Sequence, residues 1–174
     1  MPTIKTERLI LRPLTLSDLN TAHEYAGDAE HTRYMVYLPN DTIQETEYFL
    51  QKVASEWEKE TPRYYEFAIT LDGRHIGAVS VYLSEDMKTG ELGWIINKKH
   101  QGNGYVTEAA MAMLNFSRST LKTDKIIACC DYRNAASRRV MQKIGLVLES
   151  DKGTRRYKGS DEEIQDLTYS MIVE

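Results

Sequence analysis

Alternating apolar and polar positions run through much of this chain and predict a fold built largely on β-strands. Leu9 and Leu11 are two residues apart near the start, and side chains with this spacing lie on the same face of a strand. Asp72-Gly73 is a favoured two-residue hairpin turn between two such segments. The pattern predicts strands over residues 6–13, 65–71, 74–83, 90–97, 125–132, 146–157 and 163–172.

Helices are predicted where apolar residues recur every three or four positions. Thr42 and Glu45 match a capping box, and Phe49, Val53 and Trp57 then share one helical face. Further helices are predicted after a cap at Ser17, over residues 104–120, and from Asn134 to a left-handed terminator at Gly145. The order of strand, helices, three strands, helix, strand, helix and two strands predicts a mixed α/β (α+β) fold in a single domain, residues 1–174.

Composition and charge exclude several classes of protein. The net charge of −4 is spread along 174 residues without a basic stripe, so nucleic acid is not expected as a partner. No apolar run is long enough to span a bilayer and the first residues lack a signal peptide's apolar segment, so we expect a cytoplasmic protein without a membrane partner. The adjacent Cys129 and Cys130 and the four scattered histidines lack metal-ligand spacing, so no metal is expected.

The segment most informative about chemistry is residues 90–108, GELGWIINKKHQGNGYVTE. An apolar strand is followed by a polar loop with Gly102 and Gly104, and then by a helix. Glycine lets the backbone approach a ligand closely, and the first N–H groups of a helix have no partner within it. Together with the helix dipole, such a turn favours binding of a pyrophosphate or another anion.

Three other interpretations of this segment fit less well. Asn103-Gly104 is a hairpin dipeptide, but a helical pattern follows it. The dinucleotide fingerprint needs a third glycine where Thr107 stands, and Asp124 precedes its strand instead of ending it. A phosphate loop of the Walker type is excluded, because no Gly-Lys-Ser/Thr follows.

The pattern Gln101-x-x-Gly104-x-Val106 resembles the acyl-CoA loop of the GNAT superfamily of N-acetyltransferases. That loop reads Arg or Gln, two residues, Gly, one residue, then Gly or Ala, so Val106 departs from it. Residues 134–146 resemble the superfamily's second diagnostic element, a helix that flanks the pantetheine arm. Residues 6–19 and 90–109 are similar to the branch that acetylates N-terminal amines of ribosomal proteins (RimJ/RimL-like).

The resemblance implies a largely antiparallel sheet of about six to seven strands flanked by about four helices. It also implies direct transfer of an acetyl group from acetyl-CoA to a primary amine within a ternary complex. The acyl donor would be held by the strand end, the loop and the start of the later helix, which comprise Ile95, Ile96, Asn97, Gln101, Gly102, Asn103, Gly104, Tyr105, Val106 and Asn134.

Within this scheme Glu91 is the candidate base that removes a proton from the amine. By alternation it shares a strand face with Ile95, but four residues of strand span roughly 13 Å, so a water relay or a bulge is required. Asp131 is the fallback, and either carboxylate can instead be a solvated surface group. Ser137 is the candidate acid for the leaving thiolate, with the Tyr105 phenol as an alternative, although Ser137 also fits an ordinary first-turn serine.

The acceptor pocket is expected between the first helices and the loop of residues 34–39. A protein N-terminus, a polyamine, an aminoglycoside and an amino acid all remain open as acceptors, because the fold and donor site are shared by enzymes for each. A homodimer is compatible with the sequence. Two rival functions are a non-catalytic acyl-CoA-binding module and a nucleotide-dependent oxidoreductase.

Overall fold

The computed structural model describes residues 2–173. In chain order its elements are β1 (Ile4–Lys5), β2 (Ile10–Pro13), the 3₁₀ turn η1 (Leu16–Asp18), α1 (Leu19–Ala26), α2 (Ile43–Trp57), β3 (Tyr64–Leu71), β4 (Arg74–Leu83), β5 (Thr89–Ile96), the 3₁₀ turn η2 (Lys98–His100), α3 (Tyr105–Phe116), the π-turn η3 (Ser117–Leu121), β6 (Lys125–Asp131), α4 (Ala135–Lys143), β7 (Val147–Arg155) and β8 (Ile164–Ile172).

The eight strands form one sheet in the order β1-β2-β3-β4-β5-β6-β8-β7. Neighbouring strands are antiparallel except β5 and β6, which confirms the predicted mixed and largely antiparallel sheet. The prediction of one strand over residues 6–13 is wrong at its start. The Thr6 N–H donates to the Leu9 carbonyl at 2.9 Å, so residues 6–9 form a turn that separates β1 from β2.

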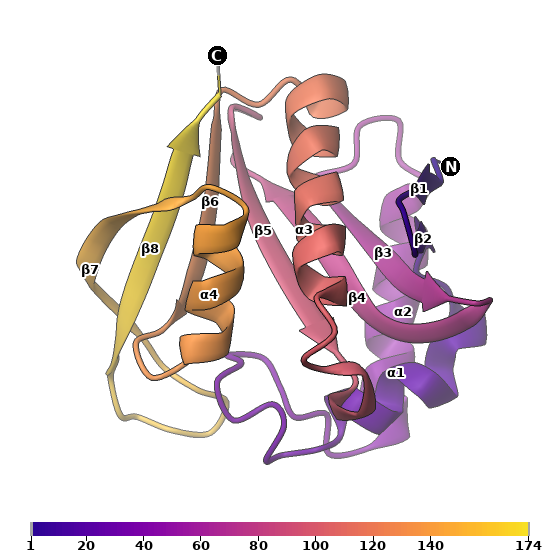
Figure 1. Cartoon of the computed structure of the whole chain (residues 1–174). Helices are drawn as coiled ribbons and strands as arrows, with labels where there is room; N and C mark the ends of the chain where they lie inside the picture. Colours follow the sequence, from indigo (N-terminus) through magenta and orange to yellow (C-terminus); the bar gives the residue numbers. More distant parts are fainter. Residues whose placement is uncertain (1, 174) are drawn as a thin grey trace.

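Helices cover both faces of the sheet (Figure 1). The helices α3 and α4 lie on one face, where Met113 and Met141 are fully buried in the larger core cluster. The helices α1 and α2 lie on the other face, and Leu50 and Val53 of α2 pack there against the sheet in a second cluster. The helical spacing of these apolar residues is what places each helix with its apolar side on the sheet.

The strands β5 and β6 are paired only at their beginning. Their parallel register starts at Thr89 with Lys125 and ends at Glu91 with Ile127, and beyond it the two strands diverge (Figure 1). The later part of β5 therefore has one edge without a partner strand, because β4 pairs only with its other edge. An unpaired edge of this kind offers N–H and C=O groups to a ligand.

Helix termini differ slightly from the sequence-based expectation. Ser17 lies inside η1, and the Asp18 carboxylate closes this turn by accepting from the Thr15 N–H at 3.0 Å. Asn134 and Gly145 do flank α4 as predicted, and Gly145 has the left-handed φ of 91°. No helix among residues 2–173 combines the length and apolar character needed to cross a bilayer.

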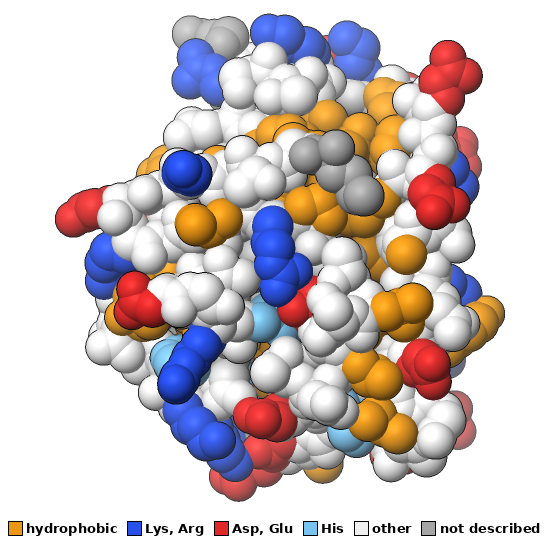
Figure 2. All heavy atoms as spheres, turned by 90° about the vertical axis from the view of Figure 1, so that its right-hand side faces the viewer, with side chains coloured by type: hydrophobic (Ala, Val, Ile, Leu, Met, Phe, Trp, Pro, Cys, Tyr) orange, Lys and Arg blue, Asp and Glu red, His pale blue; other side chains and the backbone are white. Residues whose placement is uncertain are grey.

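The β1 edge of the sheet carries an apolar surface. Figure 2 shows this face, with hydrophobic side chains gathered in its upper half. A groove of about 460 Å³ is lined there by residues of β1 and α3, including Ile4, Met111, Ala112 and Phe116. The homodimer that the sequence allows stays a prediction.

Candidate active site

The loop between η2 and α3 is shaped for an anion. Gly102 and Gly104 have the left-handed φ values of 79° and 80°, which residues with a Cβ rarely adopt. The first hydrogen bond of α3 runs from the Glu108 N–H to the Gly104 carbonyl at 3.0 Å. No backbone N–H of residues 102–107 has a hydrogen-bond partner within the described chain, so these groups lie free at the positive end of the helix.

Other polar groups hold this loop in place. The Asn103 side chain donates to the carbonyls of His100 and Gln101 at 3.2 and 3.0 Å. Arg8 donates to the Asn103 carbonyl at 2.9 Å and pairs with Glu108 at 2.7 Å. Arg8 was missed as a site residue, because its position beside the loop depends on a contact across about a hundred residues of chain.

Val106 departs from the family pattern without obstructing the loop. Its side chain is half-buried and packs against the larger core cluster. The side chain of Tyr105 packs in the same way, with the Arg8 guanidinium 4.7 Å from the ring centroid. Both side chains therefore belong to the scaffold, while their N–H groups remain in the first turn of α3.

The predicted contacts at the end of β5 differ in the direction of their backbone N–H and C=O groups. The Asn97 N–H donates to the Ile76 carbonyl of β4 at 2.8 Å and so is not free. Because successive residues of a strand point to opposite sides, Ile95 also faces β4, whereas Ile96 and Trp94 face the open edge. The free backbone groups near the end of β5 are therefore those of Trp94 and Ile96. Of the three predicted contacts Ile95, Ile96 and Asn97, only Ile96 faces the open edge.

The start of α4 lies beside this open edge of the sheet. The Asn134 side-chain carbonyl accepts from the Ser137 N–H at 3.0 Å, so it caps the helix. Among residues 2–173 its amide has no hydrogen-bond acceptor, so it can donate to a ligand. Ser137 is half-buried in the first turn of α4.

Glu91 lies where the pairing of β5 with β6 ends, on the face opposite α3. Its side chain is exposed, but shielding by neighbouring protein atoms, followed by the negative charge of Asp166, raises its pKa. The register between β4 and β5 has no bulge. No bulge shortens the distance from Glu91 to the end of β5, so a water relay is required to connect the two.

Asp131, the fallback base, is fully buried and already paired. Arg133 donates to its carboxylate at 2.7 Å, and the Tyr157 hydroxyl also donates to it. Burial alone would raise the pKa of Asp131, but these hydrogen bonds lower it below its ordinary value. An ionised carboxylate held by a cation is a weak base, so the geometry disfavours this role.

The loop, the open strand edge and the capped helix agree with a known family. A family model described as an acetyltransferase (GNAT) domain matches residues 8–147. The chain belongs to the GNAT family. It is thus an acetyl-transferring enzyme, as the resemblance implied.

The GNAT relatives include bacterial proteins of similar length. The chain is 31% identical over 148 residues to the uncharacterized N-acetyltransferase YnaD of Bacillus subtilis, covering 84% of this chain and 83% of the relative. It matches the structure of a GNAT-family acetyltransferase from Bacillus anthracis with a TM-score of 0.83, at 29% identity over 98% of both chains. It shares the fold of RimL, a ribosomal L7/L12 alpha-N-protein acetyltransferase in complex with coenzyme A, with a TM-score of 0.85 at 18% identity, covering 99% and 98% of the chains.

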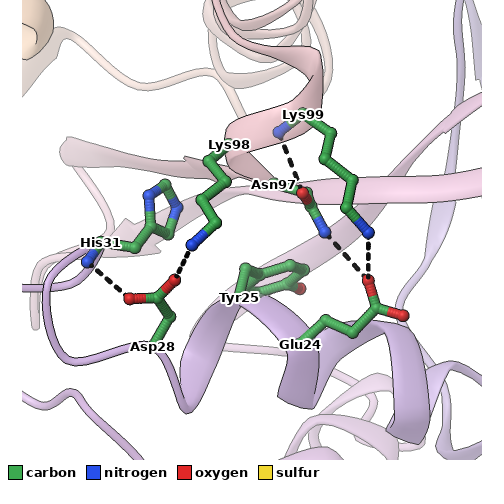
Figure 3. Close-up of a pocket in the computed structure, with 7 residues that line it drawn as sticks. All are labelled: Glu24, Tyr25, Asp28, His31, Asn97, Lys98 and Lys99. Atoms are coloured by element: carbon green, nitrogen blue, oxygen red, sulfur yellow. Dashed lines mark hydrogen bonds and ion pairs between the residues drawn. The ribbon is translucent and has the colours of Figure 1, made fainter.

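A small pocket of this GNAT domain lies where α1 meets the end of β5 (Figure 3). Lys98 pairs with Asp28 at 2.6 Å, and the Asn97 amide donates to Glu24 at 3.1 Å. The pocket holds about 180 Å³, which is below the roughly 300–1,000 Å³ of ligand sites. Its polar contacts tie the start of the donor loop to α1 and leave too little room for a cofactor.

The connection between α1 and α2 borders the sheet face of Glu91. Its Val36 carbonyl accepts from the Lys158 N–H at 3.1 Å, and its Tyr34 ring lies 5.6 Å from the Arg133 guanidinium. These contacts bring the loop next to the ends of β6 and β7, as its path in Figure 1 shows. The expected acceptor pocket remains a prediction, and the loop is placed to form one wall of it.

A second carboxylate on this face was missed by the sequence analysis. Glu66 of β3 is 6% exposed, and its carboxylate accepts from the Tyr82 hydroxyl at 2.6 Å. Burial raises the pKa of Glu66 to about 7, although hydrogen bonds from Tyr82 and Ser80 lower it in part. The sequence does show Glu66 as a single acid within the apolar segment 64–71. An alternating strand pattern, however, predicts that such a residue faces solvent.

Proposed function

We propose that this GNAT enzyme is an acetyl-CoA-dependent N-acetyltransferase whose acceptor is a primary amine. The observation that carries the proposal is the set of free N–H groups over residues 102–107, next to the open edge of β5. The residues fit acetyl-CoA, because free N–H groups at a helix start suit a pyrophosphate. A Cβ placed on Gly102 would meet no atom within 4 Å, so the loop is open to a ligand.

Each part of the donor would have its own partners in this chain. Gln101 to Val106 would hold the pyrophosphate, and the backbone of Trp94 and Ile96 would bind the pantetheine arm. The Asn134 amide would donate to that arm from the start of α4. Acetyl-CoA supplies the thioester carbonyl, and a free N–H on the β5 edge would stabilise the negative charge that develops on its oxygen.

Two side chains would transfer protons, Glu91 of β5 and Ser137 of α4. Glu91 would accept the proton of the acceptor ammonium through water, and its raised pKa suits a base that works near neutral pH. Ser137 would donate a proton to the departing thiolate. The acetyl group would pass directly to the amine, without a covalent acyl-enzyme.

The acceptor class rests on the resemblance of residues 6–19 and 90–109 to acetyltransferases of ribosomal N-termini. A library of short peptides and small amines, assayed by release of free CoA thiol, tests it. Acetylation of primary amines, including peptide N-termini, is expected. Activity confined to alcohols or thiols would contradict this proposal.

Replacing Gly104 tests the donor site directly. Gly104→Pro removes one N–H and cannot adopt the observed φ of 80°, so calorimetry should show CoA affinity lower by roughly tenfold or more. Gly104→Ala keeps the N–H and separates strain from loss of the donor. Gly73→Ala, at a hairpin glycine with a φ of 78° and open space, is the matched control and should bind CoA normally.

Unchanged CoA affinity in Gly104→Pro would overturn the assignment of the loop.

The two rival functions are distinguished by ligand-induced stabilisation, since a ligand that binds only the folded state raises the protein's melting temperature. An oxidoreductase would respond to a nicotinamide cofactor and ignore CoA. A non-catalytic module would respond to acetyl-CoA but release no thiol in the presence of amines.

A further inference from the structure

Glu66 differs from the other buried carboxylates of the protein. Among residues 2–173, four carboxylates are buried. Three of them contact a cationic side chain, in the pairs Asp18–Arg12, Glu56–Lys59 and Asp131–Arg133. Within the same residues Glu66 has no such partner, and its hydrogen bonds come from hydroxyl groups. A buried carboxylate without a cation is costly to ionise, and such groups are normally paired.

Tyr82 lies between Glu66 and the protein surface. Its hydroxyl proton is donated to the Glu66 carboxylate, so its oxygen lone pairs are left for another donor. Tyr82 is 40% exposed, and its ring stacks on that of Tyr64 with the two ring centroids 4.9 Å apart. Tyr82 is therefore a partly exposed residue that contacts the buried carboxylate directly.

A row of small side chains leads from Glu66 to the open edge of β5. Glu66 is paired with Ser80 of β4, and Ser80 is paired with Gly93 of β5. A Cβ on Gly93 would lie 2.7 Å from the Ser80 hydroxyl and would meet no other atom within 4 Å. Since neighbouring strands are about 4.8 Å apart, this row spans roughly 10 Å. Ser80, which is itself buried, and Gly93 therefore place no bulky side chain between Glu66 and the open edge.

We propose that Glu66 and Tyr82 form a subsite for a second cationic group of the acceptor, roughly 10 Å from the nitrogen that is acetylated. The proposal rests on the acetyl transfer proposed above, which places the reacting nitrogen at the open edge of β5. The distance separates Glu66 from that nitrogen, so Glu66 recognises the acceptor and Glu91 keeps the role of base. The shared chemistry is a second ammonium, whether from an aliphatic diamine or from a lysine in a peptide.

The groups around Glu66 give this subsite a characteristic dependence on pH. The titratable groups that interact electrostatically with Glu66 are the phenols of Tyr25 in α1, Tyr64 in β3 and Tyr82 in β4. Phenols stay neutral between pH 5 and 8. The remaining contacts are N–H groups that donate to its backbone carbonyl, from Leu14 after β2 and Trp57 of α2. Glu66 should therefore attract a cation above about pH 7 and much less below about pH 6.

Kinetics with matched amines test the subsite. A series from diaminopropane to diaminooctane is compared with the alkylamines of equal length, and a peptide with a lysine is compared with its norleucine analogue. The wild type should show a lower KM for acceptors whose two cations can span roughly 10 Å. The two arms identify the source of the second ammonium. Equal KM values for dicationic and monocationic acceptors in both arms would overturn the proposal.

Variants show whether Glu66 carries that preference. Glu66→Gln should raise the KM for the preferred dication about tenfold or more at pH 8, because it removes a charged hydrogen-bond acceptor. It should leave the KM for the monoamine and the affinity for acetyl-CoA nearly unchanged, and at pH 5.5 its effect should shrink. Tyr82→Phe should act in the same direction. Glu56→Gln, which removes a buried but paired carboxylate, is the control and should not change the preference.

A binding measurement distinguishes failure of the subsite from failure of the proposed function. In protein labelled with ¹³C at the glutamate carboxyls, the Glu66 signal is assigned by its loss in Glu66→Gln. Added diamine, or the lysine peptide, should lower the pKa of Glu66 from about 7. A pKa that neither probe changes, in an enzyme that acetylates amines, overturns the subsite alone. A lowered pKa in a protein that neither binds acetyl-CoA nor releases thiol supports the subsite and refutes the transferase.

Discussion

The buried carboxylate of Glu66 should make the free protein less stable as the pH rises. Its folded pKa of about 7 lies above the ordinary value of 4.5. Each tenfold change in an acid dissociation constant corresponds to about 1.4 kcal/mol, so the difference is worth about 3 kcal/mol. For a raised pKa the favourable contribution is present below the unfolded value and is lost as the pH rises through the folded value. The loss should thus occur between about pH 4.5 and pH 7.

The variant Glu66→Gln isolates this effect, since every other titrating group is common to both proteins. Urea denaturation near pH 4.5 should give nearly equal free energies of unfolding for the variant and the wild type. At about pH 8 the variant should be more stable by about 3 kcal/mol, because glutamine stays neutral. The buffer must contain no primary amine, since an amine bound at Glu66 would reduce the difference.

The control has the opposite sign. Burial would raise the pKa of Glu56, but the hydrogen bond from Lys59 and others outweigh this and lower it, so Glu56→Gln should destabilise the protein more at about pH 8 than near pH 4.5. If the stability difference between Glu66→Gln and the wild type is the same at both pH values, Glu66 does not carry an uncompensated charge. That result would refute the reasoning from its missing cationic partner.

Three further predictions concern the transfer site. Glu91→Gln should lower the rate about a hundredfold at low pH, where amines are protonated, and far less where they are neutral, and a pH–rate profile equal to the wild type would make Glu91 structural. Ser137→Ala should lower turnover with acetyl-CoA affinity retained, and an equal loss of both, seen by calorimetry, would make it a binding contact. Asp131→Asn should destabilise the fold by about 2 kcal/mol at neutral pH, since it removes the buried charged acceptor of the hydrogen bonds from Arg133 and the Tyr157 hydroxyl. Because hydrogen bonds outweigh burial and lower the pKa of Asp131, this deficit should diminish in acid, and a deficit independent of pH in denaturation curves would contradict the ion pair.

Local features of the sequence determined much of the scaffold and the donor loop. Gly102 and Gly104 adopt left-handed angles, and Asn134 caps α4. These features depend on residues a few positions apart, because glycine and capping side chains act on their own stretch of backbone. The apolar pattern likewise predicted the long strands, although β3 and β4 are buried on both faces.

Only the tertiary structure decided which polar groups are free and which are paired. Asp131 and Glu66 are both acids next to apolar strand residues, yet Asp131 has Arg133 and Glu66 has only hydroxyl partners. The same holds for β5, whose free edge exists because its pairing with β6 stops at Glu91. Arg133 is only two residues from Asp131, but the Tyr157 and Tyr82 hydroxyls that donate to Asp131 and Glu66 come from 26 and 16 residues away. The pKa of a carboxylate depends on the charges and solvent that such contacts bring to it.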